Sequence, residues 1–513
     1  MSRRIFERLL RALVVPLAAV LWLVALGSEA ALTSEVTTNA SLPELRAQLD
    51  AWLNQPRFNG ALWSVKVASL DTGRTLYEQH ADRLMSPASN SKLYTGALAL
   101  DTLGGDYHFK TPIRATAPVD TQGTVAGDLI ISGRDDPSWK AARFETIFDP
   151  FVAALTKAGV KVVTGNLVAD NTFLHGLPTG GSWAVEDVDD SEGAPISALT
   201  LADNTADIHV APGTKAGDPC EVTLTPTGTV LNVVNLTRTV PAGGEAHLEL
   251  SPATGTNDFY LLGQLPVDGK AESLDTGVSQ PARWFGAALK AALASHGIII
   301  QGGVQVVTWP ETPPWHPTDL YTLGEIQSPP LREVVRSFMK PSQNLEADLV
   351  FDHVGELARE PGTPAWVTSE ELAVRALDRF LRQHGIPHDV HFDEGSGMSR
   401  NNLTSANATV ALLTVLATNR WAADYFAALP IAGVDGTLRS RMRSGPAFGK
   451  VHAKTGTLRW VNSLSGYVTS AAGEKLVFSL MLNRYAAPPD RRRTDELDEI
   501  AGMLAAFQGR SDG

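Results

Sequence analysis

The two ends of the chain carry matching patterns of one helix and two strands. Apolar residues recur at helical spacing from Leu42 to Leu53 near the N-terminus and from Leu497 to Phe507 near the C-terminus. Between each helix and the middle of the chain stand two strand-like runs, at 61–70 and 75–78 and at 461–469 and 475–483. We therefore expect both ends to join in one α+β unit, with a sheet formed by distant segments.

The stretch between these ends has a different character from 106 to 283. Short β-type runs, such as Val230–Leu236, are interrupted there by Gly, Pro and Asp. Helical periodicity returns after residue 284, at 285–294, 331–339, 346–357 and 370–384. We therefore predict a main domain formed by 31–105 and 284–513. Residues 106–283 would be a β-rich insertion with two nested subdomains.

The first thirty residues have the pattern of an export signal. Four arginines precede an apolar run from 12 to 27, and Ser28-Glu29-Ala30 stands at cleavage-site spacing. We expect a signal peptide at 1–30, cleavage near Ala30, and an exported protein of the periplasm or cell-wall space. An uncleaved anchor is the alternative, although the run is shorter than the ~20 residues of a membrane span. Arg3-Arg4 also leaves the twin-arginine route open.

Composition excludes several classes of function. The formal net charge of −13 argues against nucleic acid as a partner, because phosphate binding requires clustered Lys and Arg. Cys220 is the single cysteine, which excludes an intrachain disulfide and a cysteine-rich zinc site. The twelve histidines show no HExxH-type spacing. The sequence therefore offers no zinc site of either kind.

Two segments match the S-x-x-K pattern of an activated serine, Ser89–Lys92 and Ser337–Lys340. Residues three apart lie on one face of a helix, so the lysine amine can accept the proton of the serine hydroxyl. For the first segment we expect a helix with Ser86 as N-cap and Pro87 in its first turn. Such a helix would place Ser89 in the first turn.

A lysine must be neutral to act as a base. Burial and a neighbouring cation both lower the pKa of an amine. We expect both effects at Lys92, and Lys454 is the candidate for the cation.

Order along the chain distinguishes the first match from the second. Ser342-Gln343-Asn344 follows Ser89, in an expected loop between helices, and Lys454-Thr455-Gly456-Thr457 comes later, in an expected strand. S-x-N also occurs at Ser399 and Ser405, but Ser405 is expected to cap a helix at 408–416. K-T-G occurs once, and its glycine would let a substrate backbone lie close to the strand. The ordered set favours Ser89 as nucleophile and Lys92 as base.

In this order the three motifs resemble those of the serine penicillin-binding proteins and β-lactamases. More narrowly, the chain resembles the D-alanyl-D-alanine carboxypeptidase/endopeptidase family, the low-molecular-mass class C penicillin-binding proteins with extra domains after the nucleophile helix. The phrases that carry this resemblance are Gly127-Asp128-Leu129, Asp136-Pro137, Ala194 to Leu199, Asp203-Asn204, Gly395 to Arg400, and Gly433 to Leu438. The resemblance implies an α+β fold of the penicillin-binding/β-lactamase-like transpeptidase type.

The resemblance also implies a mechanism that needs no metal and no organic cofactor. Ser89 would attack the carbonyl of the penultimate D-alanine while Lys92 accepts its proton. Ser342 and Lys454 would relay a proton to the leaving amine.

Further residues would bind the substrate. Asn344 would hold the substrate amide, while Thr455 and Lys454 bind its terminal carboxylate next to Gly456. The backbone N–H groups of Ser89 and Thr457 would form the oxyanion hole.

The implied activity is that of a D-Ala-D-Ala carboxypeptidase, a DD-endopeptidase, or both. Its substrates would be peptidoglycan stem peptides, and β-lactam antibiotics would inhibit it. A β-lactamase and a catalytically silent cell-wall peptide-binding protein are the alternatives. Peripheral association with the membrane or the cell wall is left open. Two positions depart from the family pattern, because Gln343 and Glu394 stand where aspartate is common.

Overall fold

The computed structural model describes residues 41–188, 190–253 and 255–512. The expected signal peptide lies outside these ranges. Among the helices in them, none combines the length and the apolar character that crossing a membrane requires.

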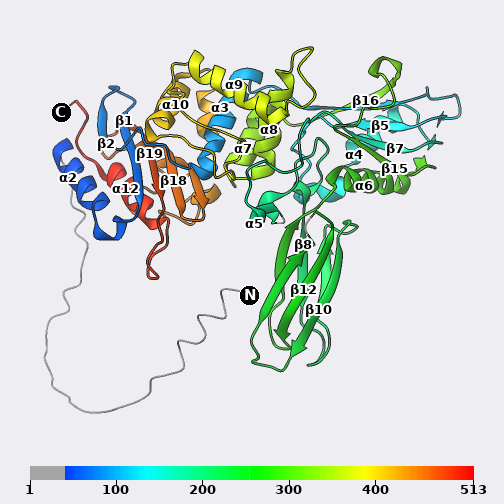
Figure 1. Ribbon diagram of the computed structural model, residues 1–513, viewed down its shortest axis with the longest axis horizontal. Helices are drawn as coiled ribbons and strands as arrows, with labels where there is room; N and C mark the ends of the chain where they lie inside the picture. Colours follow the sequence, from blue (N-terminus) through cyan, green and yellow to red (C-terminus); the bar gives the residue numbers. More distant parts are fainter. Residues whose placement is uncertain (1–40, 189, 254, 513) are drawn as a thin grey trace. The chain divides into compact units, whose positions relative to one another are not determined.

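One antiparallel sheet joins the two ends of the chain, as the sequence predicts (Figure 1). Its strand order is β17-β18-β19-β1-β2. The strands are β1 (Leu62–Ser69), β2 (Thr75–Gln79), β17 (Val451–Leu458), β18 (Val461–Thr469) and β19 (Lys475–Asn483). β1 pairs with β19 along its whole length, from Leu62 opposite Asn483 to Ser69 opposite Leu476. β17 forms the edge of the sheet.

Helices cover both faces of this sheet. α2 (Leu42–Leu53) and α12 (Asp495–Ala506) pack on one face (Figure 1). Successive strand residues point to opposite faces, so Phe478 of β19 joins the α2–α12 cluster and the adjacent Val477 joins the opposite one. The opposite layer contains α3 (Ser91–Leu103), α7 (Leu331–Met339), α8 (Asn344–Leu357), α9 (Ser369–Gln383), α10 (Ala406–Thr418) and α11 (Ala422–Ala428).

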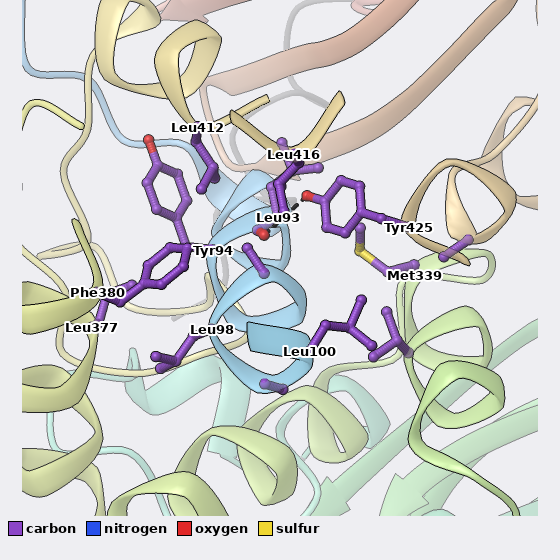
Figure 2. Packing of buried hydrophobic residues seen from close by; sticks show 14 of the residues in the cluster. Leu93, Tyr94, Leu98, Leu100, Met339, Leu377, Phe380, Leu412, Leu416 and Tyr425 are labelled. Carbon is purple, nitrogen blue, oxygen red and sulfur yellow. Dashed lines mark hydrogen bonds between the residues drawn. The ribbon is translucent and has the colours of Figure 1, made fainter. Parts of the chain in front are cut away.

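Helix α3 lies inside this second layer and is buried from Ser91 to Leu100. Figure 2 shows its side chains Leu93 and Leu98 surrounded by residues of the neighbouring helices, among them Met339, Phe380 and Leu416. The Tyr425 hydroxyl also donates a hydrogen bond of 3.0 Å to the backbone oxygen of Leu93 (Figure 2). Close packing on all sides makes α3 a rigid support for the residues that precede it.

The described residues in the middle of the chain form four further sheets, ordered β10-β12-β11, β13-β8-β9, β14-β6-β4 and β15-β7-β5-β3-β16. Their strands are β3 (Lys110–Ala115), β4 (Thr124–Val125), β5 (Leu129–Ser132), β6 (Val162–Val163), β7 (Leu167–Asn171), β8 (Thr205–Ala211), β9 (Glu221–Thr225), β10 (Asn232–Val240), β11 (His247–Pro252), β12 (Asp258–Pro266), β13 (Glu272–Gly277), β14 (Ile299–Ile300), β15 (Val304–Thr308) and β16 (Tyr321–Gln327). The associated helices are α4 (Asp149–Lys157), α5 (Val185–Val188) and α6 (Pro281–Ser295).

These sheets extend past the expected boundary at residue 283. β15 pairs with β7 and β16 pairs with β3, so the sheets end at Gln327. Helix α6 caused the misplacement, because its periodicity was assigned to the helical main domain. Its buried side chains, including Trp284 and Phe285, pack instead in the core of the inserted sheets.

Candidate active site

Ser89 lies in a short 3-10 turn, η3 (Ala88–Asn90), which leads directly into α3. The prediction of one α-helix capped by Ser86 is wrong at this point. Ala88 has a φ of 49°, in the left-handed region, and a residue in that region cannot continue a right-handed helix. The Ser86 N–H donates instead to Asn483 Oδ1 at 2.9 Å. A strained alanine directly before the nucleophile costs on the order of 1 kcal/mol, which the surrounding packing must offset.

Two glycines allow the backbone to approach this turn closely. A Cβ at Gly456 would lie 2.5 Å from the Pro87 backbone oxygen, and one at Gly397 would lie 2.0 Å from that of Ala88. The Ser463 hydroxyl, from β18, donates to the same Pro87 oxygen at 2.6 Å. The nucleophile turn is therefore held between the edge of the sheet and the loop at 395–400. The glycine of K-T-G serves this contact inside the protein.

Lys92 is fully buried and its amine makes three polar contacts. Its Nζ lies 3.1 Å from Ser89 Oγ, 2.5 Å from Asn344 Oδ1 and 2.7 Å from the backbone oxygen of Ser396. A neutral amine has two N–H donors and one lone pair. The two oxygens that can only accept, those of Asn344 and Ser396, take the donors, which leaves the lone pair for the Ser89 hydroxyl.

Burial lowers the pKa of Lys92 to about 8, against the opposing charges of Asp348, Glu394 and Glu192. Burial also lowers the pKa of Lys454 well below its ordinary value, and the charge of Lys92 lowers it further. The charge of Lys454 was expected to lower the pKa of Lys92, but burial lowers it instead. The charge of Lys92, in turn, helps to lower the pKa of Lys454.

Ser342 lies in the loop between α7 and α8, as predicted, and Asn344 is the first residue of α8. Lys454 Nζ donates to Ser342 Oγ at 2.7 Å and to the Thr455 backbone oxygen at 2.9 Å. Gln343 caps α8, since its side-chain oxygen accepts the Glu346 N–H at 3.0 Å. The glutamine at this position therefore performs the capping that a shorter carboxylate would also perform.

Glu394, the second departure from the family pattern, organises the loop beside Lys92. Its carboxylate accepts the N–H of Ser396 at 3.0 Å and that of Gly397 at 2.8 Å, and the amide of Asn402 at 2.6 Å. These bonds fix the turn that presents the Ser396 oxygen to Lys92.

Sequence reasoning missed several residues that complete the site. Thr437 Oγ1 lies 2.7 Å from Thr455 Oγ1, and the contacts of Ser396, Ser463 and Glu192 were not foreseen either. Three of these residues had a sequence signal, because Ser396 and Thr437 stand in family-like phrases and Glu192 lies two positions before another. Thr457, by contrast, follows Gly456 with an exposed side chain.

The second S-x-x-K match has no such arrangement. Lys340 Nζ forms an ion pair of 2.6 Å with Asp435 and donates to the Leu429 backbone oxygen at 2.6 Å. Ser337 Oγ accepts a hydrogen bond of 2.5 Å from Lys140. The choice of Ser89 over Ser337 therefore agrees with the geometry.

The fold and this set of side chains are those of a penicillin-binding-type serine acyl-transfer protein. The chain belongs to the D-Ala-D-Ala carboxypeptidase 3 (S13) family, whose sequence profile matches residues 45–504.

Individual relatives support this membership over nearly the whole chain. A D-alanyl-D-alanine carboxypeptidase of Actinomadura sp. is 33% identical over 496 residues, which cover 94% of this chain and 88% of the relative. D-alanyl-D-alanine carboxypeptidase DacB of Haemophilus influenzae is 25% identical over 423 residues, which cover 82% of this chain and 84% of the relative. The crystal structure of penicillin binding protein 4 (dacB) from H. influenzae superposes with a TM-score of 0.76 at 25% identity. The match covers 89% of this chain and 98% of that structure. The expected α+β fold with an added β-rich region is confirmed.

Proposed function

We propose that this chain is a serine-type D-alanyl-D-alanine peptidase that cleaves peptidoglycan stem peptides through an acyl-enzyme at Ser89. Membership of the S13 family supports the reaction and its substrate class. The geometry of Lys92 supports the assignment of residues, because its amine lies 3.1 Å from Ser89 Oγ and its other two contacts are acceptors. The enzyme is a carboxypeptidase, an endopeptidase or both.

In the acylation step, Ser89 Oγ attacks the carbonyl carbon of the penultimate D-alanine and Lys92 accepts the hydroxyl proton. The backbone N–H groups of Ser89 and Thr457 would stabilise the resulting oxyanion. Because β17 is an edge strand, an extended peptide can lie along it and place its carbonyl over the nucleophile turn.

The leaving amine must gain a proton for the peptide bond to break. Lys454 and Ser342, whose Nζ and Oγ atoms lie 2.7 Å apart, would provide the route for that proton. Thr455 and Lys454 would bind the terminal carboxylate, and Asn344 the substrate amide. Water then attacks the acyl-enzyme, releasing the shortened peptide and restoring the Ser89 hydroxyl.

The same site would react with β-lactam antibiotics, whose strained amide acylates the serine. Export to the periplasm or cell-wall space, with a signal peptide cleaved near Ala30, fits a substrate that lies outside the cytoplasm. Peripheral association with the membrane or cell wall is part of this proposal.

Digestion of purified muropeptides tests the activity. Release of D-alanine from pentapeptide monomers identifies carboxypeptidase activity, and conversion of cross-linked dimers to monomers identifies endopeptidase activity. Absence of both products, despite stoichiometric labelling by penicillin, would contradict the proposal and favour a silent binding protein. A short-lived penicilloyl adduct with rapid turnover of penicillin would favour a β-lactamase instead.

A further inference from the structure

Both protons of the Asn344 amide nitrogen are engaged by the inserted region, and its oxygen keeps one lone pair that could accept a substrate N–H. Asn344 Oδ1 accepts from Lys92 at 2.5 Å. Its Nδ2 donates to the backbone oxygen of Glu192 at 3.0 Å and to the carboxylate of the same residue at 2.8 Å. Because an amide nitrogen has two protons, Glu192 takes both of them.

This arrangement determines which way the Asn344 amide faces. If the amide were rotated by half a turn, its NH₂ would face the Lys92 amine and its oxygen would face the Glu192 carboxylate. The first contact would either oppose donors or occupy the lone pair that Lys92 needs as a base, and the second would oppose acceptors. Glu192 thus favours the orientation in which the amide oxygen binds an N–H of Lys92 and leaves the lone pair for Ser89.

The inserted region holds Glu192 firmly in place. Glu192 lies in the short turn η5 (Ser191–Gly193), whose N-cap Asp190 accepts the Glu192 N–H at 3.2 Å. The Ser191 hydroxyl donates to Asp275 of β13. A Cβ at Gly193 would lie 1.8 Å from the Asp187 backbone oxygen, so only glycine allows this approach. A second contact joins the inserted region to α8, where Lys140 forms an ion pair with Glu346.

We propose that Glu192 is a positioning residue for acylation, through which the inserted region orients Asn344 and thereby directs the Lys92 amine at Ser89. The inserted region would then complete the catalytic centre in addition to any part it has in binding large substrates. The inference rests on the proposed function, because it assumes that Ser89 is acylated.

The charge of Glu192 provides a second readout. Its carboxylate raises the pKa of Lys92, together with Asp348 and Glu394, while burial lowers it. The pKa of Glu192 is itself raised, first by partial burial and also by the neighbouring charges of Asp190 and Asp275, while those of Lys92 and Lys454 oppose the shift. Removing the negative charge should therefore lower the pKa of Lys92. The rising part of the pH–rate profile for acylation, its acid limb, should then move to lower pH.

The experiment measures the second-order rate constant for acylation by a fluorescent penicillin from pH 5 to 10. In the unchanged protein we expect the rate to rise through the pKa of Lys92, about 8, to a plateau. Glu192→Ala should lower that plateau by about three- to tenfold, a partial loss because the backbone oxygen still accepts from Asn344. Glu192→Gln keeps an acceptor and should retain the plateau within about twofold.

In both variants the acid limb should move to lower pH by a few tenths of a unit, since Glu192 is partly exposed and solvent screens part of its charge. Glu186→Gln is the matched control, because Glu186 is an exposed carboxylate of the same segment. It should change neither the plateau nor the limb. Because Glu192 is partly exposed, its variants should also fold normally, which thermal unfolding checks.

The outcomes separate this inference from the proposed function. Labelling that persists in Ser89→Ala would overturn the proposed function whatever Glu192 does. If Ser89→Ala loses labelling, a Glu192→Ala plateau equal to that of the unchanged protein would overturn the positioning role. An acid limb that stays in place, or moves to higher pH, would overturn the electrostatic contact with Lys92.

Discussion

The chain contains the same four-residue pattern twice, and the two copies fold into opposite environments. Lys92 is fully buried, contacts its own motif's serine and has a lowered pKa. Lys340 is partly buried, forms an ion pair with Asp435, and its motif's serine is engaged by Lys140. An ion pair stabilises the charged form of an amine, whereas burial among neutral oxygens favours the neutral form. Spacing alone therefore does not make a base of a lysine; the groups packed around it do.

Removing each serine in turn should show the largest difference between the two copies of the pattern. Ser89→Ala should abolish labelling by fluorescent penicillin, because no other hydroxyl lies beside the Lys92 amine in the described contacts. Ser337→Ala should label at the normal rate, since that hydroxyl only accepts a hydrogen bond from Lys140. Gel fluorescence after a fixed exposure measures both. The reverse result would transfer the nucleophile to the second copy.

Conservative replacement of each lysine gives the next largest effect. Lys92→Arg should reduce acylation by about 10³-fold, because a guanidinium stays protonated and cannot accept the serine proton. Lys340→Arg preserves the positive charge opposite Asp435, so its rate should stay within a few-fold of normal. Stopped-flow acylation at pH 8 measures both rates. A Lys92→Arg protein that acylates rapidly would show that Lys92 is not the base.

The packing around the first copy can be tested at Gly456. A methyl group there would lie 2.2 Å from Ser463 Oγ and 2.5 Å from the Pro87 oxygen, so either β17 or the nucleophile turn must move. We expect Gly456→Ala to slow acylation by about 10- to 100-fold, corresponding to overpacking of 1–3 kcal/mol.

Gly502 of α12 is the matched control for this substitution. Its Cβ would meet nothing within 4 Å, and alanine favours helix, so Gly502→Ala should leave the rate unchanged and raise stability by ~0.5–1 kcal/mol. Equal acylation rates in the two variants would contradict the close approach of β17.

The contrast between the two copies also shows what the sequence could and could not predict. Periodicity located the strands at 461–469 and 475–483 and helix α7 correctly, because amphipathic patterns record which face each element buries. It misplaced the start of α3, since Ala88 adopts a left-handed conformation that only its packing imposes. Motif order favours Ser89, whose Oγ lies 3.1 Å from Lys92 Nζ.

Long-range contacts account for what the sequence missed. Glu192 reaches Asn344 from a segment 152 positions away, and no local pattern records such a contact. The extent of the inserted sheets was missed for the same reason, because the partners of β15 and β16 precede them by more than one hundred residues. Local patterns therefore identified elements and motifs, while the partners of each charged group required the fold.

The smallest expected effect concerns Lys340 of the second S-x-x-K segment, which helps to hold a neighbouring loop in place. Asp435 accepts the Ile431 N–H at 2.9 Å as well as pairing with Lys340, and the Thr437 N–H donates to the Lys340 backbone oxygen at 3.0 Å. These bonds hold the loop that carries Thr437 against Thr455. Asp435→Asn keeps the shape but removes the charge, so it should cost about 1 kcal/mol of stability or less, since the pair is partly exposed to solvent.

Activity should respond to Asp435→Asn more in substrate affinity than in turnover, because the disturbed loop contacts the residue proposed to bind the terminal carboxylate. We expect KM for a D-alanyl-D-alanine peptide to rise by about two- to fivefold, the equivalent of less than 1 kcal/mol, with kcat nearly unchanged. Steady-state release of D-alanine measures both constants. A fall in kcat with KM unchanged would instead place Lys340 and Asp435 in the chemistry of the acyl-enzyme, and the two copies of the pattern would no longer differ in kind.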